Sequence, residues 1–326
     1  MLSLNLQKYR MGALAPLIIG LCILPFFARA YVVEVAMLFF IYLMLASSYR
    51  LIVSVHDWQL YHVVLYGVGA YTSGLLAKNF GIPIWVTIPI GGAMASLVGV
   101  AITRTLLRTR GWGFYIATFG LAELIRLCWL KFRTPFGGST GIIAIPYGPV
   151  VAGIDFGERI PYYFFVMGVM FASMYALYRI DRSRIGDSFK AIYTDPLLAE
   201  SIGIRVPRYR LLACAIGGFI AGIAGGLLVH RLGAVDPRVF DVITMIYLLV
   251  WVVVGGYRTF WGPVIGVSVM QAVFELSRPL LEIRPLFFGL AMILVLVVMP
   301  GGLESLILRA MARFRRLRGT ETVGTG

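Results

Sequence analysis

The stretch that decides the fold lies at residues 209–232, which read YRLLACAIGGFIAGIAGGLLVHRL. Between Arg210 and His230 this stretch carries no charged side chain, and about 20 such residues in a helix are enough to cross a bilayer. Similar apolar runs recur on both sides of it. The runs are 12–28, 31–50, 60–79, 82–106, 113–130, 160–179, 209–232, 240–256, 262–278 and 284–300. The pattern predicts an all-α protein, a polytopic transmembrane helix bundle of about ten spans.

The composition excludes the other broad classes of protein. Of the 326 residues, 60% are apolar and only 13% are charged, whereas an ordinary soluble domain has about a quarter of its residues charged. So few charges cannot cover the surface of a water-soluble globule of this size. Disordered chains are polar and highly charged, so the same numbers exclude disorder.

The charged residues orient the predicted bundle. The formal net charge is +14, and a basic chain can bind nucleic acid. Here the arginines stand in short loops between apolar runs, where positive charge marks the cytoplasmic side. If ten helices alternate, these clusters fall on one side: Lys8 and Arg10, Arg104 to Arg110, Arg179 to Arg210, and Arg309 to Arg318. Both termini are therefore expected in the cytoplasm, with Lys131 and Arg133 as exceptions on the outer side.

The first run admits a second interpretation. Its basic start, its apolar stretch and the sequence Ala28-Arg29-Ala30 are also typical of a cleavable signal peptide. We favour retention as a span, because a polytopic protein needs no removable signal, and cleavage would leave the remaining topology unchanged. The chain is then one transmembrane domain over 1–326, with a cytoplasmic loop at 180–208 and a basic cytoplasmic tail at 303–326.

Two segments between spans are unusually long. Residues 131–159 are expected outside and contain the turn-rich sequence TPFGGSTG. Residues 180–208 are expected inside, as two short helices at the membrane surface, with Asp195-Pro196 as a helix start and Gly203 as a helix stop. Their apolar face consists of Phe189, Ile192, Leu197, Leu198, Ile202 and Ile204. A loop this long with its own helical pattern is uncommon unless it has a function.

The sequence carries no recognisable catalytic or metal-binding motif. None of its four lysines follows a glycine, so the phosphate loop Gly-x-x-x-x-Gly-Lys-Ser/Thr is absent. His56, His62 and His230 lack the spacing of metal ligands, and the three cysteines lie in apolar runs without a disulfide pattern. We therefore expect neither enzyme activity nor a cofactor in this chain.

Glycines interrupt the run at 60–79, at Gly67, Gly69 and Gly74, and the polar Thr72 accompanies them. Two interpretations remain open. Small residues let membrane helices approach closely, whereas Gly-interrupted, discontinuous helices border substrate sites near the midplane. Further glycines in the runs at 209–232 and 240–278 allow the same two interpretations.

Ionisable groups at membrane depth are costly and usually face the interior of a bundle. Glu123 and Arg126 stand three residues apart in the run 113–130, so they share a helix face and can pair. A structural ion pair is the simpler interpretation, and contact with a solute is the alternative. Glu34 and Arg50 lie near the ends of spans, where long side chains can reach water.

Several segments now combine into a family pattern. They are 183–186 (SRIG), 199–204 (AESIGI), 208–213 (RYRLLA), 221–226 (AGIAGG), 254–263 (VGGYRTFWGP), 67–72 (GVGAYT) and 137–141 (GGSTG). Together they resemble the LivM-like permeases, which are membrane subunits of the branched-chain amino acid family of ABC importers. The resemblance covers nearly the whole chain after about residue 30, and the cytoplasmic loop is its most specific part.

The resemblance implies a division of labour among subunits in a bacterial inner membrane. Two membrane subunits, here this chain and a LivH-like relative, would form the path. Two ATPase subunits would bind the cytoplasmic loops and use the ATP, and an extracytoplasmic binding protein would deliver the solute. Ala199, Glu200 and Gly203 match the Glu-Ala-Ala…Gly type of coupling loop, and Asp187 belongs to the same segment. A short helix would dock in a cleft of the ATPase, with glycine allowing a sharp turn behind it.

One stretch departs from the family pattern. Where the family usually has a small Ser-Leu-Gly-His sequence, this chain has Gln59-Leu60-Tyr61-His62. If the stretch lines the path, the solute or the way it is held has changed, which disfavours leucine and isoleucine and favours another amino acid or a small polar or carboxylated solute. The residues expected to line the path are Gln59, Tyr61, His62, Tyr66, Gly67, Gly69, Thr72 and Glu123.

Two other functions compete with an importer permease. A secondary transporter driven by an ion gradient would carry ionisable residues near the midplane of several spans, and only Glu123 and Arg126 qualify. An intramembrane enzyme would need paired catalytic carboxylates, a Ser/Lys pair or a metal cluster at membrane depth, and the sequence offers none. The sequence therefore predicts a permease subunit of an ATP-driven importer of a small polar solute.

Overall fold

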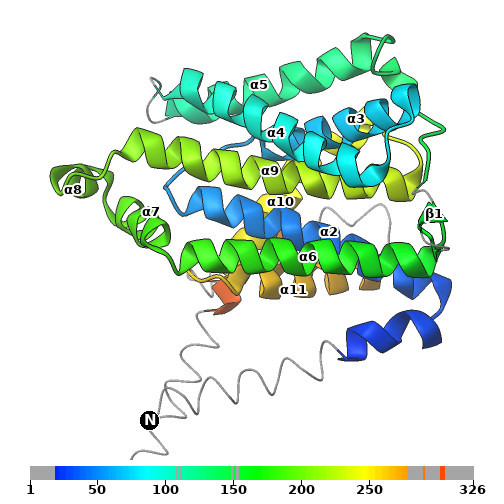
Figure 1. Cartoon of the computed structure of the whole chain (residues 1–326). Helices are drawn as coiled ribbons and strands as arrows, with labels where there is room; N and C mark the ends of the chain where they lie inside the picture. Colours follow the sequence, from blue (N-terminus) through cyan, green and yellow to red (C-terminus); the bar gives the residue numbers. More distant parts are fainter. Residues whose placement is uncertain are drawn as a thin grey trace, which may run out of the picture.

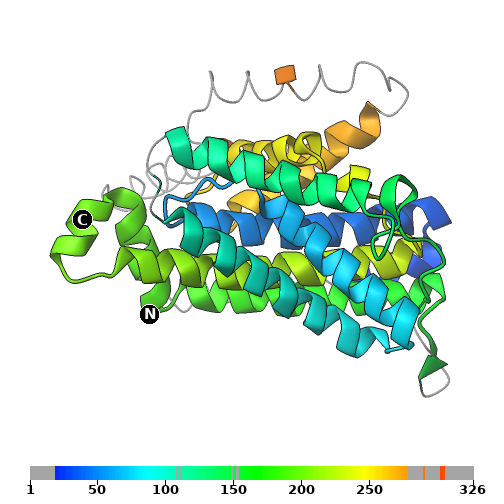
Figure 2. The ribbon, with the colours of Figure 1, turned by 90° about the horizontal axis from the view of Figure 1, so that it is seen from above.

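The computed structural model is a bundle of long helices lying side by side (Figures 1 and 2). It describes residues 19–107, 109, 112–147, 150–151, 154–277, 289–290 and 302–304. The long helices are α2 (Ala30–Val53), α3 (His62–Phe80), α4 (Ile84–Leu106), α5 (Trp112–Lys131), α6 (Arg159–Asp181) and α9 (Val206–Leu232). The shorter ones are α7 (Arg184–Thr194), α8 (Pro196–Ser201), α10 (Val242–Gly255) and α11 (Gly262–Leu276).

The helices follow the apolar runs of the sequence. Among the described residues, α2, α4, α5, α6 and α9 are long and apolar enough to cross a membrane, and α10 and α11 are shorter apolar helices. This confirms the polytopic helix bundle. Of the first run, residues 19–27 are helical. The rest of that run, most of the tenth run and nearly all of the basic tail lie outside the described residues.

Helix α9, the stretch that decided the fold, lies at the centre of the bundle, where it packs against α2, α3 and α4. Glycines allow the closest approach. A Cβ atom on Gly69 of α3 would lie 2.2 Å from the carbonyl oxygen of Gly222 of α9, and one on Gly91 of α4 would lie 2.7 Å from the carbonyl oxygen of Gly69. Three helices therefore cross where only hydrogen atoms fit between their backbones.

The glycines of α3 and α9 do not interrupt these helices, so discontinuous helices, one of the two interpretations that the sequence left open, are wrong at these two places. Both helices run without a break, and their glycines lie where neighbouring helices approach closely. The chain leaves the helical conformation elsewhere, for example at 54–61 between α2 and α3 and at 256–261 between α10 and α11.

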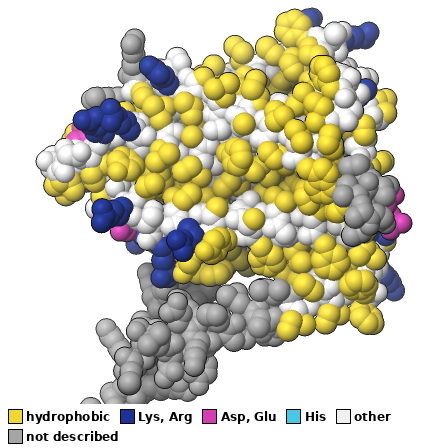
Figure 3. All heavy atoms as spheres, viewed as in Figure 1, with side chains coloured by type: hydrophobic (Ala, Val, Ile, Leu, Met, Phe, Trp, Pro, Cys, Tyr) yellow, Lys and Arg dark blue, Asp and Glu magenta, His cyan; other side chains and the backbone are white. Residues whose placement is uncertain are grey.

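The two ends of the bundle differ in structure. One end carries α7 and α8, and the other carries a short hairpin of β1 (Val150–Val151) and β2 (Ile154–Asp155) (Figure 1). The turn-rich stretch ends there in η1 (Gly138–Thr140), and Ile142 forms an antiparallel bridge with Val235. In the space-filling view, apolar side chains form a wide band between ends that carry Lys and Arg (Figure 3).

The end that carries α7 and α8 confirms the two predicted short helices and their junction. The carboxylate of Asp195 caps α8 by accepting hydrogen bonds from the backbone N–H groups of Leu197 and Leu198, at 2.8 and 3.1 Å. Pro196 occupies the first turn, where the missing N–H has no cost. Gly203 then turns the chain with φ +88°.

Candidate functional site

The apolar face predicted for the 180–208 loop divides between its two helices. In α7, Phe189 and Ile192 are completely buried, and the ring of Phe189 meets that of Tyr209 edge-on at 6.0 Å. Around α8, three apolar side chains remain between 62% and 78% exposed: Leu197, Leu198 and Ile202. The first helix is therefore part of the bundle, whereas the second presents an apolar surface with nothing of the described chain upon it.

Two of the predicted coupling residues, Ala199 and Glu200, belong to α8 itself. The side chain of Ala199 is buried, whereas that of Glu200 is exposed. The N–H of Ile204 donates to the carbonyl of Ala199 at 3.0 Å, which closes the helix through the left-handed turn at Gly203. Asp187 lies in the first turn of α7, exposed, 3.4 Å from the ammonium group of Lys190.

Arg50 connects three elements near the start of α7: α2, α6 and the α10–α11 connection. Its Nη1 pairs with the carboxylate of Asp181 at 2.7 Å, and its Nε donates to the carbonyl of Tyr257 at 3.2 Å. Asp181 is the last residue of α6, directly before α7, and Tyr257 lies in the connection from α10 to α11. Although Arg50 lies near a helix end as expected, it is buried and does not reach water.

Aromatic side chains join α7 to the α2–α3 and α10–α11 connections. Tyr193, in the last turn of α7, packs against His56 at 5.7 Å and against Tyr257 at 5.5 Å between ring centroids. Tyr257 in turn meets Trp58 edge-on at 5.4 Å. His56 and Trp58 belong to the connection from α2 to α3. A displacement of α7 would therefore act directly on the α2–α3 and α10–α11 connections.

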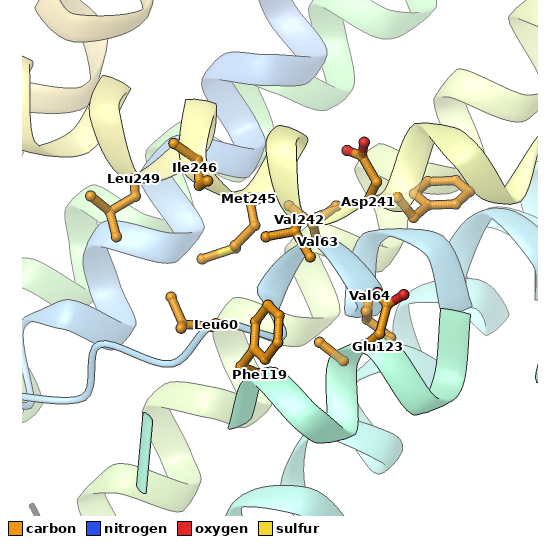
Figure 4. A pocket seen from close by; sticks show the side chains of 12 residues that line it. Leu60, Val63, Val64, Phe119, Glu123, Asp241, Val242, Met245, Ile246 and Leu249 are labelled. Carbon is orange, nitrogen blue, oxygen red and sulfur yellow. The ribbon is translucent and has the colours of Figure 1, made fainter. Parts of the chain in front are cut away.

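A cavity of about 260 Å³ lies between α3, α5 and α10 (Figure 4). Its walls are apolar except at one end, where the carboxylates of Glu123 and Asp241 stand. Asp241 also caps α10 by accepting a hydrogen bond from the N–H of Thr244 at 2.8 Å. Of the predicted path residues, Glu123 lines this cavity, and so does Leu60 from the stretch that departs from the family pattern.

Glu123 forms the predicted ion pair with Arg126. The guanidinium Nε lies 2.8 Å from Glu123 Oε2, and a second contact makes the pair bidentate. Arg126 is also attracted by Asp241. The arrangement is thus one guanidinium group near two carboxylates, at the polar end of an apolar cavity.

The other predicted path residues lie inside the bundle. Gln59, Tyr61 and His62 are fully buried. The hydroxyl of Tyr61 hydrogen-bonds Thr103 at 2.6 Å, and Nε2 of His62 hydrogen-bonds Ser48 at 3.0 Å. In this structure Tyr61 and His62 tie helices together, and a role for the three side chains in the path stays a prediction.

The remaining four predicted path residues belong to α3. A Cβ atom on Gly67 would lie 2.6 Å from the ring of Trp129, and Gly69 meets Gly222. Tyr66 is buried with its ring edge-on to Phe240, and Thr72 is half-buried. These contacts favour close packing as the reason for the glycines of α3.

The comparisons with known proteins agree on one family. The family model described as branched-chain amino acid transport system / permease component matches residues 31–299. The chain is similar to the high-affinity branched-chain amino acid transport system permease protein LivM of Escherichia coli (strain K12), with 28% identity over 303 residues that cover 86% of this chain and 71% of the relative.

Two further relatives extend the comparison. The LivM protein of Salmonella typhimurium is 26% identical over 91% of this chain and 75% of its own length. The probable branched-chain amino acid transport permease protein LivH of Methanocaldococcus jannaschii is 28% identical over 61% of this chain and 64% of its own length. No solved structure matches the chain.

Proposed function

The chain belongs to the family of permease components of branched-chain amino acid transport systems, and on this premise we propose that it forms half of a solute path worked by separate ATPase subunits. It is a multi-pass membrane protein and a permease subunit of an ABC importer, not an enzyme. The family match favours this function over the ion-gradient-driven transporter that the sequence also allowed.

The apolar surface of α8 is the observation that carries the coupling proposal. Leu197, Leu198 and Ile202 are exposed around α8, which lies at one end of the bundle (Figure 1). Three neighbouring apolar side chains in water are unfavourable, and burying them against a cleft of a partner would supply binding energy. Glu200, exposed beside them, can pair with a basic residue of that partner.

Helix α7 would then transmit the movement of the docked ATPase. It packs against α6 and α9, and its Tyr193 contacts the α2–α3 and α10–α11 connections. Since Arg50 ties the end of α6 to α2 and to the α10–α11 connection, a shift of α7 would reach all of these elements together. Docking and transmission are thus assigned to two different helices of one loop.

The solute is proposed to be an amino acid or a related small polar or carboxylated compound. The relatives are named as branched-chain amino acid permeases, and the cavity beside Glu123 is apolar with charged groups at one end. A molecule that joins a charged group to a short apolar part matches such walls.

The partners are proposed from the same family. They are a second, LivH-like permease, two ATPase subunits that use ATP, and an extracytoplasmic binding protein. The chain itself is proposed to need no cofactor. It would lie in a bacterial inner membrane, with both termini in the cytoplasm.

The test compares two exposed apolar residues at opposite ends of the bundle. Leu198 on α8 is 62% exposed, and Ile143, which follows the Ile142–Val235 bridge, is 64% exposed. Leu198→Asp should reduce the ATPase recovered with the tagged chain at least about tenfold, or ~1.4 kcal/mol, and should abolish ATP-driven uptake. Ile143→Asp should leave ATPase recovery unchanged. Equal ATPase recovery in both variants would refute docking at α8.

A further inference from the structure

Helix α5 is the least covered of the five long apolar helices. Only 17% of its apolar window is buried, against 39% to 72% for the other four. One side of the helix, called here the α5 face, consists of Gly113, Ile116, Gly120, Leu124 and Leu127, which are all exposed. An apolar exposed face alone would suit contact with lipid.

The ion pair beside this face is incompatible with lipid. Glu123 is the twelfth of the 20 residues of α5, about 16 Å from one end of the helix and about 12 Å from the other. That depth is near the middle of a bilayer, where a charged side chain costs about 2.5–3.5 kcal/mol or more. Yet the side chains of Glu123 and Arg126 keep 28% and 18% of their surface open. Glu123 is too far from either end of α5 for its side chain to reach water along the membrane normal, and the guanidinium group of Arg126 is held against it.

A cavity lies on one side of the ion pair. It is the cavity toward α10, which holds Asp241 near Arg126, so a third charge lies beside the pair. On the other side, Gly120, Glu123 and Leu127 border the open surface of α5 itself. Charges in the middle of an apolar helix that border a cavity on one side and an uncovered face on the other indicate a path or an interface between proteins.

We infer that the second permease subunit packs against the α5 face, so that Glu123, Arg126 and Asp241 open onto a path enclosed between the two subunits. The inference rests on the proposed function, which requires two permeases. Gly113 and Gly120 stand seven residues apart on one helix side with no atom within 4 Å, which leaves room for the backbone of a partner helix.

A related permease is the occupant that fits best. This chain is 28% identical both to a LivM protein and to a LivH protein, so the two kinds of permease are expected to share this fold. Each could then present the equivalent face to the other about a pseudo-twofold axis. The charged groups of both subunits would meet at that axis, away from lipid.

A pair of glycines provides a matched test. Gly120 on α5 and Gly168 on α6 are both exposed within a long apolar helix, and neither would bring a Cβ atom within 4 Å of another group. In the isolated chain, both positions face open space, so we expect Gly120→Trp and Gly168→Trp to leave its fold intact. In membranes that contain the complete importer, Gly120→Trp should reduce recovery of the second permease with the tagged chain at least tenfold. Gly168→Trp should leave that recovery unchanged, and equal recovery for both variants overturns the inference.

Site-specific photo-crosslinking tests the same face without disturbing it. A photoreactive residue at Leu124 or Leu127 should form an adduct with the second permease, whereas one at Leu97 of α4 or Tyr175 of α6, which are similarly exposed, should react with lipid alone. Lipid adducts alone from α5, or adducts between two copies of this chain, overturn the inference.

These experiments distinguish a failure of the α5 interface from a failure of the proposed function. Recovery of the ATPase with the unmodified chain tests the proposed function by itself. If the ATPase is recovered but Leu124 and Leu127 react only with lipid, the importer function stands and the interface is wrong. If no ATPase is recovered in any condition, the proposed function fails, whatever the α5 face contacts.

Discussion

Asp57 lies in the connection between α2 and α3 and is almost completely buried. Burial raises the pKa of its carboxyl from 3.8 to about 6, while the attraction of Arg210 partly opposes this rise. A carboxyl that is hard to ionise in the folded state makes the stability of the fold depend on pH.

We predict that Asp57→Asn removes this dependence. Because the folded pKa lies above the unfolded one, the contribution to stability is full below about pH 4 and is lost as the pH rises through about 6. The difference of about two pH units corresponds to a loss of about 3 kcal/mol. Unfolding of the detergent-solubilised protein should therefore show the variant gaining stability over the wild type at pH 8 and not at pH 4. A variant with the wild-type pH profile would contradict the assignment.

Arg50 provides a second prediction, on the tie between helices. Arg50→Met leaves the partly buried carboxylate of Asp181 without its partner, at a cost of about 3–5 kcal/mol. The double variant Arg50→Met/Asp181→Leu removes both charges and should recover most of that stability, as measured by unfolding in detergent. If the tie transmits movement from α7, ATP-driven uptake stays low in the double variant although the ATPase still binds. Normal uptake in the double variant would show that the pair serves stability alone.

These residues also show which features can be predicted from the sequence and which cannot. The cap at Asp195 and the turn at Gly203 are local features, so neighbouring residues were enough to predict them. Arg50 was placed correctly at a helix end, but its partner Asp181 is 131 residues away, and no local pattern connects the two. For the same reason, the attraction between Asp241 and Arg126 was missed, although the Glu123–Arg126 pair itself follows from spacing alone.

At the scale of elements, the bundle depends on where helices approach most closely. Gly69, Gly91 and Gly222 come from three different helices and meet at one crossing. The sequence predicted that small residues would matter there, but it left open whether they break the helices or let them pack. That choice depends on the neighbouring backbone, which only the folded chain supplies.

Gly69→Ala tests this crossing. Its new methyl group would lie 2.2 Å from the carbonyl oxygen of Gly222, and a backbone atom cannot move aside without displacing its helix. We expect a loss of about 3 kcal/mol in the free energy of unfolding, at the upper end of overpacking effects. Gly168→Ala, which meets no group within 4 Å, is the control and should be neutral or slightly stabilising, because alanine favours helix. Equal stability of the two variants would refute the close crossing.

The packing of α7 and α8 also explains why the sequence predicted the structure of the 180–208 loop only in part. The periodicity correctly predicted two short helices and their apolar positions. It could not tell that Phe189 and Ile192 face the bundle while Leu197 and Leu198 face outward, since all four have the same pattern in the sequence. The angle between α7 and α8 at Asp195-Pro196 makes this division.

At the scale of the whole molecule, the apolar band and the two charged ends define a membrane protein whose orientation remains a prediction (Figure 3). The number of spans also stays a prediction, because part of the first run and most of the tenth run lie outside the described residues. Orientation is decided by the difference in positive charge between the two sides, because basic loops are held on the cytoplasmic side during insertion.

Single cysteines at three places test the orientation. The exposed Thr194 lies at the end of α7. Ile143 follows Ile142, which bridges Val235 beyond the end of α9 that lies away from α8. Arg315 belongs to the basic tail outside the described residues. With both termini in the cytoplasm, a thiol reagent that cannot cross membranes should label Ile143→Cys in cells with a permeable outer membrane and should label Thr194→Cys and Arg315→Cys only in inverted vesicles. Wild-type protein, which retains Cys22, Cys128 and Cys214, gives the background. Thr194 and α8 lie at the same end of the bundle. Labelling of Thr194→Cys from outside would therefore place α8 on the outer side of the membrane, where a cytoplasmic ATPase cannot bind it.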